Sequence, residues 1–127
     1  MKFSAPLDFS VIGAALASVK LHKDGTVARL QQNLWSRLRE FAEAPSGMEF
    51  VSPIAMVPTR DVQSCLEAGT KLKERGYFVS TVFFPVVARD QAQLRLCVSV
   101  DHSSEQLAGL RESLHDLGLW PPEFATR

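Results

Sequence analysis

The most restrictive feature of this sequence is a β-strand pattern that passes directly into a helix start. From Gln93 to Val100 apolar and polar residues alternate strictly, which is typical of a strand with one buried face. Ser103 and Gln106 follow at the spacing of a capping box, which begins a helix. The alternation puts one set of side chains on the buried face (Leu94, Leu96, Val98, Val100) and the other set opposite (Gln93, Arg95, Cys97, Ser99).

The remaining elements are predicted from apolar spacing and from start and stop residues. An Ala-rich helix is expected over about Ser10–Lys20, and its small side chains suit close packing against another element. An amphipathic helix is expected from Thr26, as its N-cap, to a stop at Pro45-Ser46-Gly47. A third helix starts at Asp61 and ends at Gly76, a final helix ends at Gly118, and two strands cover Met48–Val57, kinked by Pro53, and Tyr77–Phe84.

This order of elements, α-α-β-α-β-β-α, predicts an α+β fold. We expect a small, at least partly antiparallel sheet with helices on one face. The domain boundaries follow from the same pattern. Residues 1–45 form a helical segment that leads into a small α+β domain over residues 46–118, and residues 119–127 form a tail.

Composition narrows the possible functions. The 127 residues are 46% hydrophobic and 22% charged, as in an ordinary soluble globular protein, and one domain is expected. Fourteen basic and fourteen acidic residues balance to +0 without a local basic cluster, which argues against nucleic acid and an anionic membrane as partners. No apolar run is long enough to span a bilayer, so a cytoplasmic protein is expected, and Pro6 and Asp8 argue against a signal peptide.

The sequence offers little for metal or nucleophilic catalysis. Cys65 and Cys97 lack a CxxC partner and histidines at ligand spacing, so both are expected to be buried, reduced thiols and no metal site is expected. A phosphate-binding glycine loop and the common hydrolase motifs are also missing. No catalytic and no cofactor-binding residue is therefore assigned within this sequence.

Arg95 is the residue that stands out chemically. It lies in the middle of the alternating strand, on the face opposite the aliphatic side chains. A planar guanidinium suits bidentate binding of a carboxylate. The alternative is an exposed arginine paired with a nearby acid, which is common at protein surfaces.

Two weaker candidates have structural alternatives. His102 beside Asp101 has the composition of an acid–base pair, but such a histidine more often helps to cap the following helix. The aromatic run (Tyr77, Phe78, Phe83, Phe84) has the surface to stack a ligand, but aromatic strand residues are usually core.

Four stretches then resemble a known family. They are Phe3-Ser4-Ala5-Pro6-Leu7, Ser52-Pro53-Ile54, Glu74-Arg75-Gly76-Tyr77-Phe78-Val79, and the run from Pro85-Val86-Val87 through Leu94-Arg95-Leu96 to Asp101-His102-Ser103. In order and spacing they resemble the C-terminal part of the α-oxoamine synthases, pyridoxal-phosphate (PLP)-dependent enzymes of fold type I. This family includes 8-amino-7-oxononanoate synthase, 2-amino-3-ketobutyrate CoA ligase and serine palmitoyltransferase, and the resemblance covers about nine-tenths of the chain.

The resemblance implies a function and a role for one residue. The parent enzyme would condense an amino acid with an acyl-CoA or acyl-carrier thioester, with loss of carbon dioxide. Arg95 falls on the second arginine of the family's R-x-R pair, which in relatives holds the carboxylate of the amino-acid substrate. The implied partners are a cofactor-binding large domain, the two substrates and a second copy of the enzyme, since the family is homodimeric.

The sequence also departs from the family. Val87-Ala88-Arg89-Asp90 replaces the family's V-P-x-G loop, Gln93 replaces the first arginine of the pair, and Asp101 brings a negative charge near Arg95 in sequence. The family's Schiff-base lysine lies upstream of Phe3, so PLP belongs to the parent enzyme and no cofactor is expected on this chain alone. The alternative function is a free-standing, non-catalytic binding or regulatory module, or an inactive remnant of the domain.

Overall fold

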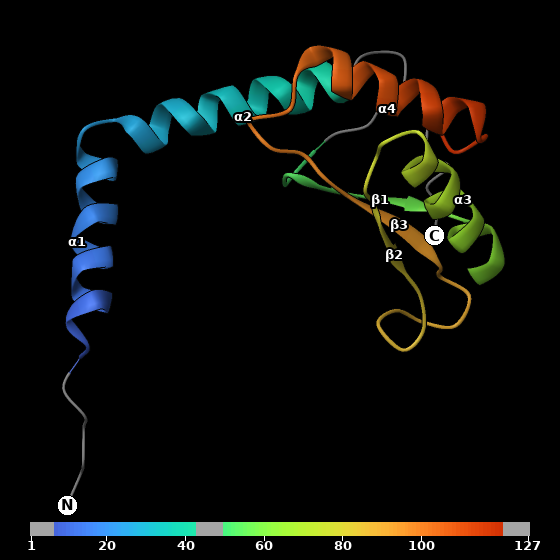
Figure 1. The fold of residues 1–127 in the computed structure, drawn as a ribbon, viewed down its shortest axis with the longest axis horizontal. Coiled ribbons are helices and arrows are strands. Elements are labelled where there is room, and N and C mark those ends of the chain that lie inside the picture. The colour runs from blue at the N-terminus through green and yellow to red at the C-terminus, as the bar shows by residue number, and fades with distance from the viewer. Residues whose placement is uncertain (1–6, 43–49, 121–127) are drawn as a thin grey trace, which may run out of the picture. The chain divides into compact units, whose positions relative to one another are not determined.

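The computed structural model describes residues 7–42 and 50–120 (Figure 1). Four helices and three strands follow in the predicted order. They are α1 (Phe9–Lys23), α2 (Thr26–Ala42), β1 (Ile54–Pro58), α3 (Val62–Glu74), β2 (Ser80–Val82), β3 (Gln93–Cys97) and α4 (Ser104–Asp116). The chain divides into two compact units, residues 1–33 and residues 34–127, and each is described by itself.

The second unit contains an antiparallel sheet in the order β1-β3-β2. Leu94 and Leu96 of β3 are buried opposite Val57 and Ala55 of β1, so these positions share one face. Arg95 lies between the two leucines and is exposed on the other face. The described helices of this unit pack against the first face, which confirms the predicted α+β class with helices on one side of a small sheet.

The core lies between that face and the helices of the second unit. Leu38 and Phe41 from the C-terminal part of α2, Leu72 of α3 and Leu114 of α4 are almost fully buried there. Phe41 packs against the Phe50 and Trp120 rings, with centroid distances of 6.1 Å and 4.9 Å. Cys65 is buried as predicted, and its thiol donates a hydrogen bond of 3.3 Å to the Gln93 carbonyl.

Glycine allows α3 to approach the sheet closely. A Cβ built on Gly69 would lie 2.7 Å from Cγ2 of Thr81 in β2, closer than real Cβ atoms come to a neighbour. The Ala-for-Gly preference of a helix interior is about 1 kcal/mol, so the glycine here is retained for packing rather than for helix formation. α3 therefore rests directly on the edge strand.

Local signals in the sequence set most helix ends correctly. The Asp61 carboxylate accepts from the Ser64 amide at 2.7 Å and caps α3, a contact that also lowers the pKa of Asp61. Gly76 has φ +89°, the left-handed conformation expected after the α3 C-cap. Thr26 was wrongly predicted as an N-cap. It is the first residue of α2, and its amide donates to the Asp24 carboxylate at 2.9 Å.

The strands are shorter than the apolar runs predicted. β2 covers only Ser80–Val82 of the expected Tyr77–Phe84, because the Tyr77 amide still bonds the end of α3 and a turn begins at Phe83. β3 ends at Cys97 rather than Val100, because the Ser99 amide donates to the His102 ring. β1 starts after Pro53, which has no N–H for the ladder. The predicted stop at Pro45-Ser46-Gly47, the strand start at Met48 and the tail beyond Trp120 lie outside the described residues.

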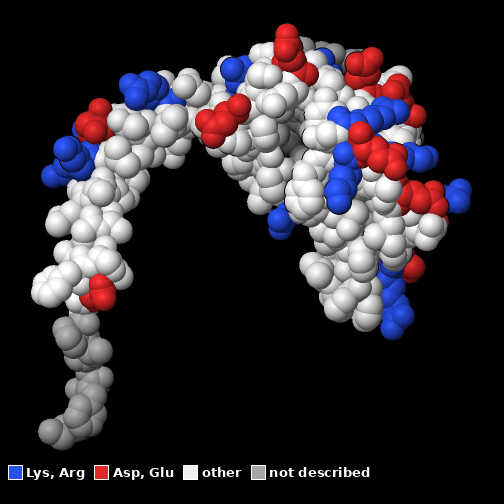
Figure 2. All heavy atoms as spheres, in the orientation of Figure 1, with Lys and Arg blue, Asp and Glu red and all other residues white. Residues whose placement is uncertain are grey.

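α1, in the first unit, has no buried residue. No charged side chain lies between Asp8 and Lys20, and the apolar residues of this stretch are exposed, with Phe9 at 90% and Leu16 at 65%. Figure 2 shows this helix as almost uniformly uncharged, with acidic and basic side chains only near its ends. The first unit therefore presents apolar surface that no described residue of its own covers.

Candidate functional site

Arg95 lies at the centre of the open sheet face. β3 is the middle strand, and Arg95 is paired with Met56 of β1 on one side and Ser80 of β2 on the other. The next positions on the same face, two residues along each strand, are uncharged (Ile54, Pro58, Val82, Gln93 and Cys97). On this part of the sheet face the Arg95 guanidinium is therefore surrounded by uncharged side chains of the described strands.

No hydrogen bond or ion pair joins the Arg95 side chain to another described residue. The ion pairs in the described part of the chain are Arg37–Glu40, Arg60–Asp61 and Arg75–Asp116. Asp101, which the sequence placed near Arg95, instead contacts the Ser99 hydroxyl at 3.5 Å. The alternative of an arginine paired with a surface acid is therefore not found among residues 7–42 and 50–120. The donor fork of Arg95 is available to an external carboxylate.

The loop between β2 and β3 borders this face and departs from the family pattern. It contains a cis peptide bond between Phe84 and Pro85. It also contains two turns, which are closed by hydrogen bonds from the Val86 amide to the Phe83 carbonyl and from the Gln91 amide to the Ala88 carbonyl. The Arg89 guanidinium lies 4.4 Å from the centre of the Phe84 ring, a cation–π contact. The base of the loop is fastened where the Thr59 amide and hydroxyl both donate to the Ala92 carbonyl at 2.9 Å.

Three expectations about side chains near the site are corrected. Cys97 is exposed rather than buried, because it shares the open face with Arg95. Phe78 and Phe84 are exposed, because the edge strand is too short to bury the whole aromatic run, whereas Tyr77 and Phe83 pack against the core. His102 does not cap α4. Its ring closes the preceding turn, and Ser103 is the cap.

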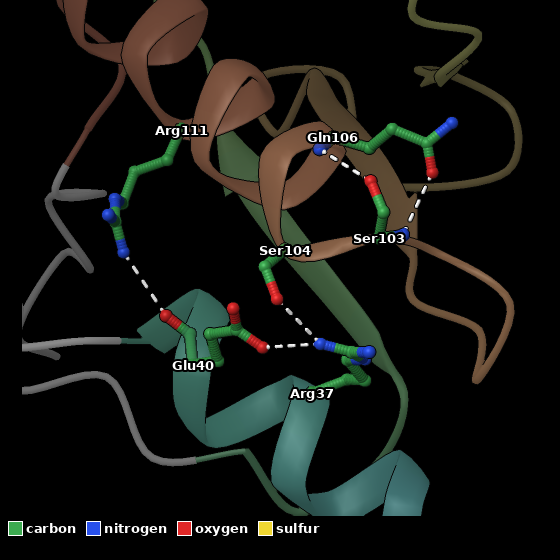
Figure 3. A network of polar contacts seen from close by, with 6 residues as sticks. All are labelled: Arg37, Glu40, Ser103, Ser104, Gln106 and Arg111. Atoms are coloured by element: carbon green, nitrogen blue, oxygen red, sulfur yellow. Dashed lines mark hydrogen bonds and ion pairs between the residues drawn. The ribbon is translucent and has the colours of Figure 1, made fainter.

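A polar network joins the C-terminal part of α2 to α4, behind the sheet (Figure 3). One Arg37 nitrogen donates to Glu40 at 2.9 Å and to the Ser104 hydroxyl at 2.7 Å, and Arg111 donates to the Glu40 carbonyl at 3.1 Å. Hydrogen bonds from Ser104 and then from Arg37 hold the pKa of Glu40 below its ordinary value. The network fixes two helices of the scaffold rather than a reacting group.

The described residues do not form a cofactor or metal site around Arg95. Lys71 and Lys73 lie on α3, which covers the opposite face of the sheet, and Lys20 and Lys23 lie on α1. Among the described residues, the face of Arg95 thus has no lysine that could bind PLP. Within the described ranges no three His, Cys, Asp or Glu side chains gather as a metal site, and none of the described helices could cross a membrane.

A second feature, not predicted from the sequence, is a cavity of about 420 Å³ between the end of β3, residues 75–79 that precede β2, and the N-terminal part of α4. His102 and Gln106 line it together with mostly apolar side chains. The one signal for it in the sequence was the capping box. It predicts that the side-chain oxygen of Gln106 bonds the Ser103 amide, and this leaves the Gln106 amide nitrogen for another partner.

Comparison with known proteins bears directly on the family. The chain is 32% identical to the 8-amino-7-oxononanoate synthase of Petrotoga mobilis over 110 residues, which are 83% of this chain. It is 26% identical to the 2-amino-3-ketobutyrate coenzyme A ligase of Escherichia coli over 121 residues, or 91% of this chain. The chain is a homologue of the α-oxoamine synthases, over their C-terminal region. The resemblance noted in the sequence is thus confirmed.

The fold agrees with this homology. A solved serine palmitoyltransferase from S. paucimobilis, with bound PLP, matches with a TM-score of 0.68 over 91% of this chain at 22% identity. No family model matches the chain. The chain spans 28% and 30% of the two relatives and 31% of that structure. It thus corresponds to about a third, or less, of a PLP-dependent α-oxoamine synthase.

Proposed function

We propose that this chain is the C-terminal small domain of a PLP-dependent α-oxoamine synthase-like acyltransferase. Arg95 binds the carboxylate of the amino-acid substrate, and the chain is not catalytic alone. The observation that carries the proposal is the isolated guanidinium on the open face, flanked by Met56 and Ser80 and without an acidic partner among the described residues. PLP and its lysine belong to the cofactor-binding large domain of the parent.

The geometry supports a positioning role for Arg95. A guanidinium donates two parallel hydrogen bonds to a carboxylate and fixes its plane as well as its position. The central strand of a sheet whose opposite face is packed holds the Arg95 backbone rigidly. In the parent, the acyl-CoA or acyl-carrier thioester would then meet an amino acid whose orientation Arg95 has already set.

The rest of the assembly belongs to the same proposal. Residues 1–45 lead into the small domain of residues 46–118, whose core also includes Leu38 and Phe41 of α2, and the exposed apolar side chains of α1 pack on the large domain. The parent is a cytoplasmic homodimer. The open face around Arg95 is closed by the large domain when substrate binds.

The test is made on the coding region that contains this chain together with its upstream in-frame sequence. The product is loaded with PLP and assayed for thiol release from acyl-CoA with small amino acids. Arg95→Gln is expected to raise KM for the amino acid about 10- to 100-fold, the usual value of a charge-assisted bidentate contact. KM for the thioester should stay unchanged. Arg95→Lys keeps the charge but not the fork, so it should recover only part of the loss.

Arg39→Gln is the matched control, because Arg39 is an exposed arginine of α2 outside the sheet. An unchanged amino-acid KM in Arg95→Gln would refute the carboxylate role. The alternative function, a non-catalytic binding module, is favoured by the buried core that residues 34–127 possess by themselves. An upstream sequence without a PLP-binding domain, together with saturable amino-acid binding by the chain alone, would establish that alternative.

A further inference from the structure

The cavity between the end of β3, residues 75–79 and α4 is separate from Arg95, which does not line it. Its volume of about 420 Å³ lies in the range of small-molecule sites. Tyr77 forms part of its wall, and the hydroxyl of this side chain lies against the bare Cα of Gly109, where a Cβ would collide with it. Most of the lining is apolar (Phe78, Val79, Leu96, Val98, Leu107 and Leu110).

The His102 ring has one nitrogen that is not engaged by a described residue, Nε2, and this nitrogen is a hydrogen-bond donor. The Ser99 amide donates to Nδ1 of His102 at 3.0 Å, so this nitrogen uses its lone pair. A neutral imidazole with Nδ1 as acceptor carries its hydrogen on Nε2. The His102 backbone amide donates to the Ser99 carbonyl at 3.3 Å, but the ring makes no second hydrogen bond to a described residue, so the Nε2–H remains unused.

The side chain of Gln106 likewise accepts a hydrogen bond from a backbone amide and keeps a donor. The Ser103 amide donates at 2.9 Å to the side-chain oxygen of Gln106, which settles which end of the amide is oxygen. Figure 3 shows this oxygen turned toward Ser103 and the amide nitrogen turned away. The remaining NH₂ group donates to no described residue. Each of these two side chains of the cavity thus keeps an unused donor among the described residues, the Nε2–H of His102 and the NH₂ group of Gln106.

The Tyr77 hydroxyl and the Cys97 thiol also line the cavity, and each can donate to an anion as well as accept. Arg75, at the rim, is also a donor, and its guanidinium is paired with Asp116 at 2.9 Å. No described aspartate or glutamate lines the cavity. An apolar body with an anionic oxygen group at one end is the ligand chemistry that this lining fits.

We propose that the cavity binds a small apolar carboxylate, whose oxygens accept hydrogen bonds from Nε2 of His102 and the amide nitrogen of Gln106. The apolar chain of the ligand lies against Val79, Leu107 and Leu110. This site is independent of the proposed function, because it uses neither Arg95 nor PLP and is complete within residues 75–110.

The probe is octanoate, titrated into the ¹⁵N-labelled 127-residue chain, with 1-octanol as the uncharged ligand of the same length. Saturable amide shifts are expected over residues 75–79, 96–98 and 102–110. Octanoate should bind at least about tenfold more tightly than octanol, because only the acid uses the two donors strongly. Equal affinities, or the absence of saturation, would overturn the proposal.

Gln106→Glu is the sharpest variant, because glutamate serves the capping box as well as glutamine does. The cap and the fold should therefore persist, while the donor becomes a carboxylate that repels the ligand. We expect octanoate affinity to fall at least about tenfold and octanol affinity to stay unchanged. Thermal unfolding of the variant verifies that α4 is intact, and unchanged octanoate affinity in a folded variant refutes the proposal.

Arg95→Gln separates this site from the one on the open face. Octanoate binding should be unaffected by it. Loss of binding in this variant, with shifts at Met56 and Ser80, would mean that the acid uses Arg95, and the cavity would then carry no site. Failure of the cavity proposal leaves the amino-acid KM of the parent untouched, so the two proposals fail separately.

Discussion

At the scale of single residues, Arg95 shows how a strand can expose one charge while hiding its neighbours. The period of two sends Leu94 and Leu96 into the core and Arg95 to the opposite face. This placement follows from sequence alone. Whether an acid reaches the guanidinium depends on the neighbouring strands, which supply Met56 and Ser80 there. The sequence could therefore predict where Arg95 lies but not that it lacks an acidic partner among the described residues.

Glu40 is the residue for which a pH dependence is expected. Hydrogen bonds from Ser104 and Arg37 lower its pKa from the ordinary value of 4.5, so its contribution to stability is complete above that value. The contribution is lost as the pH falls below 4.5 through the lowered pKa of the folded state. The difference in unfolding free energy between the unsubstituted 127-residue chain and Glu40→Gln should therefore be constant near neutral pH and shrink in acid.

The measurement is urea unfolding between neutral pH and the acid limit of the folded chain. Glu112→Gln is the control, because Glu112 is an exposed glutamate of the neighbouring helix α4. The difference in unfolding free energy between Glu112→Gln and the unsubstituted chain should show no comparable loss in acid. If the difference in unfolding free energy between Glu40→Gln and the unsubstituted chain stayed the same in acid, the Glu40 carboxylate would not stabilise the contact between α2 and α4.

At the scale of elements, the sequence predicted order and type better than length. Caps and stops act within a few residues, so Asp61, Gly76 and Ser103 were readable directly. Strand length depends on a partner, and apolar letters do not reveal where pairing ceases. β2 stops where the loop turn begins at Phe83, and β3 stops where the Ser99 amide turns to His102. The same limit applies to the cavity, which β3, α4 and residues 75–79 line together although they are far apart in the sequence.

The contact between α3 and β2 gives a prediction at this scale. Gly69→Ala adds a methyl group 2.7 Å from Cγ2 of Thr81. Overpacking typically costs about 1–3 kcal/mol, against a gain of about 1 kcal/mol in helix propensity. The variant should therefore lose roughly 1 kcal/mol in denaturant unfolding.

Thr81→Ser removes the obstructing methyl group and makes the prediction a double-mutant cycle. In this background Gly69→Ala should be neutral or stabilising by up to about 1 kcal/mol, because only the helix preference remains. An equal loss of stability in both backgrounds would show that the two residues do not meet.

At the scale of the whole molecule, the two units differ in what holds them together. Residues 34–127 contain the sheet and the buried cluster, including Phe41, Leu72 and Leu114. α1 buries none of its residues, and a helix of this length is marginal in water without packing. A unit with its own core, beside a helix that no described residue of its own unit covers, agrees with the proposal that this chain is part of a larger enzyme.

Hydrogen exchange of the 127-residue chain tests this difference. At concentrations where sedimentation shows a monomer, amides of α1 should exchange close to unfolded rates, whereas those of β3 and α4 should be protected by the global unfolding free energy. In the parent enzyme, α1 should become as slow as β3, because the large domain would cover Phe9, Leu16 and their neighbours. Slow exchange of α1 in the monomeric chain would mean that the helix is stable without a partner, and its apolar surface would no longer argue for a missing domain.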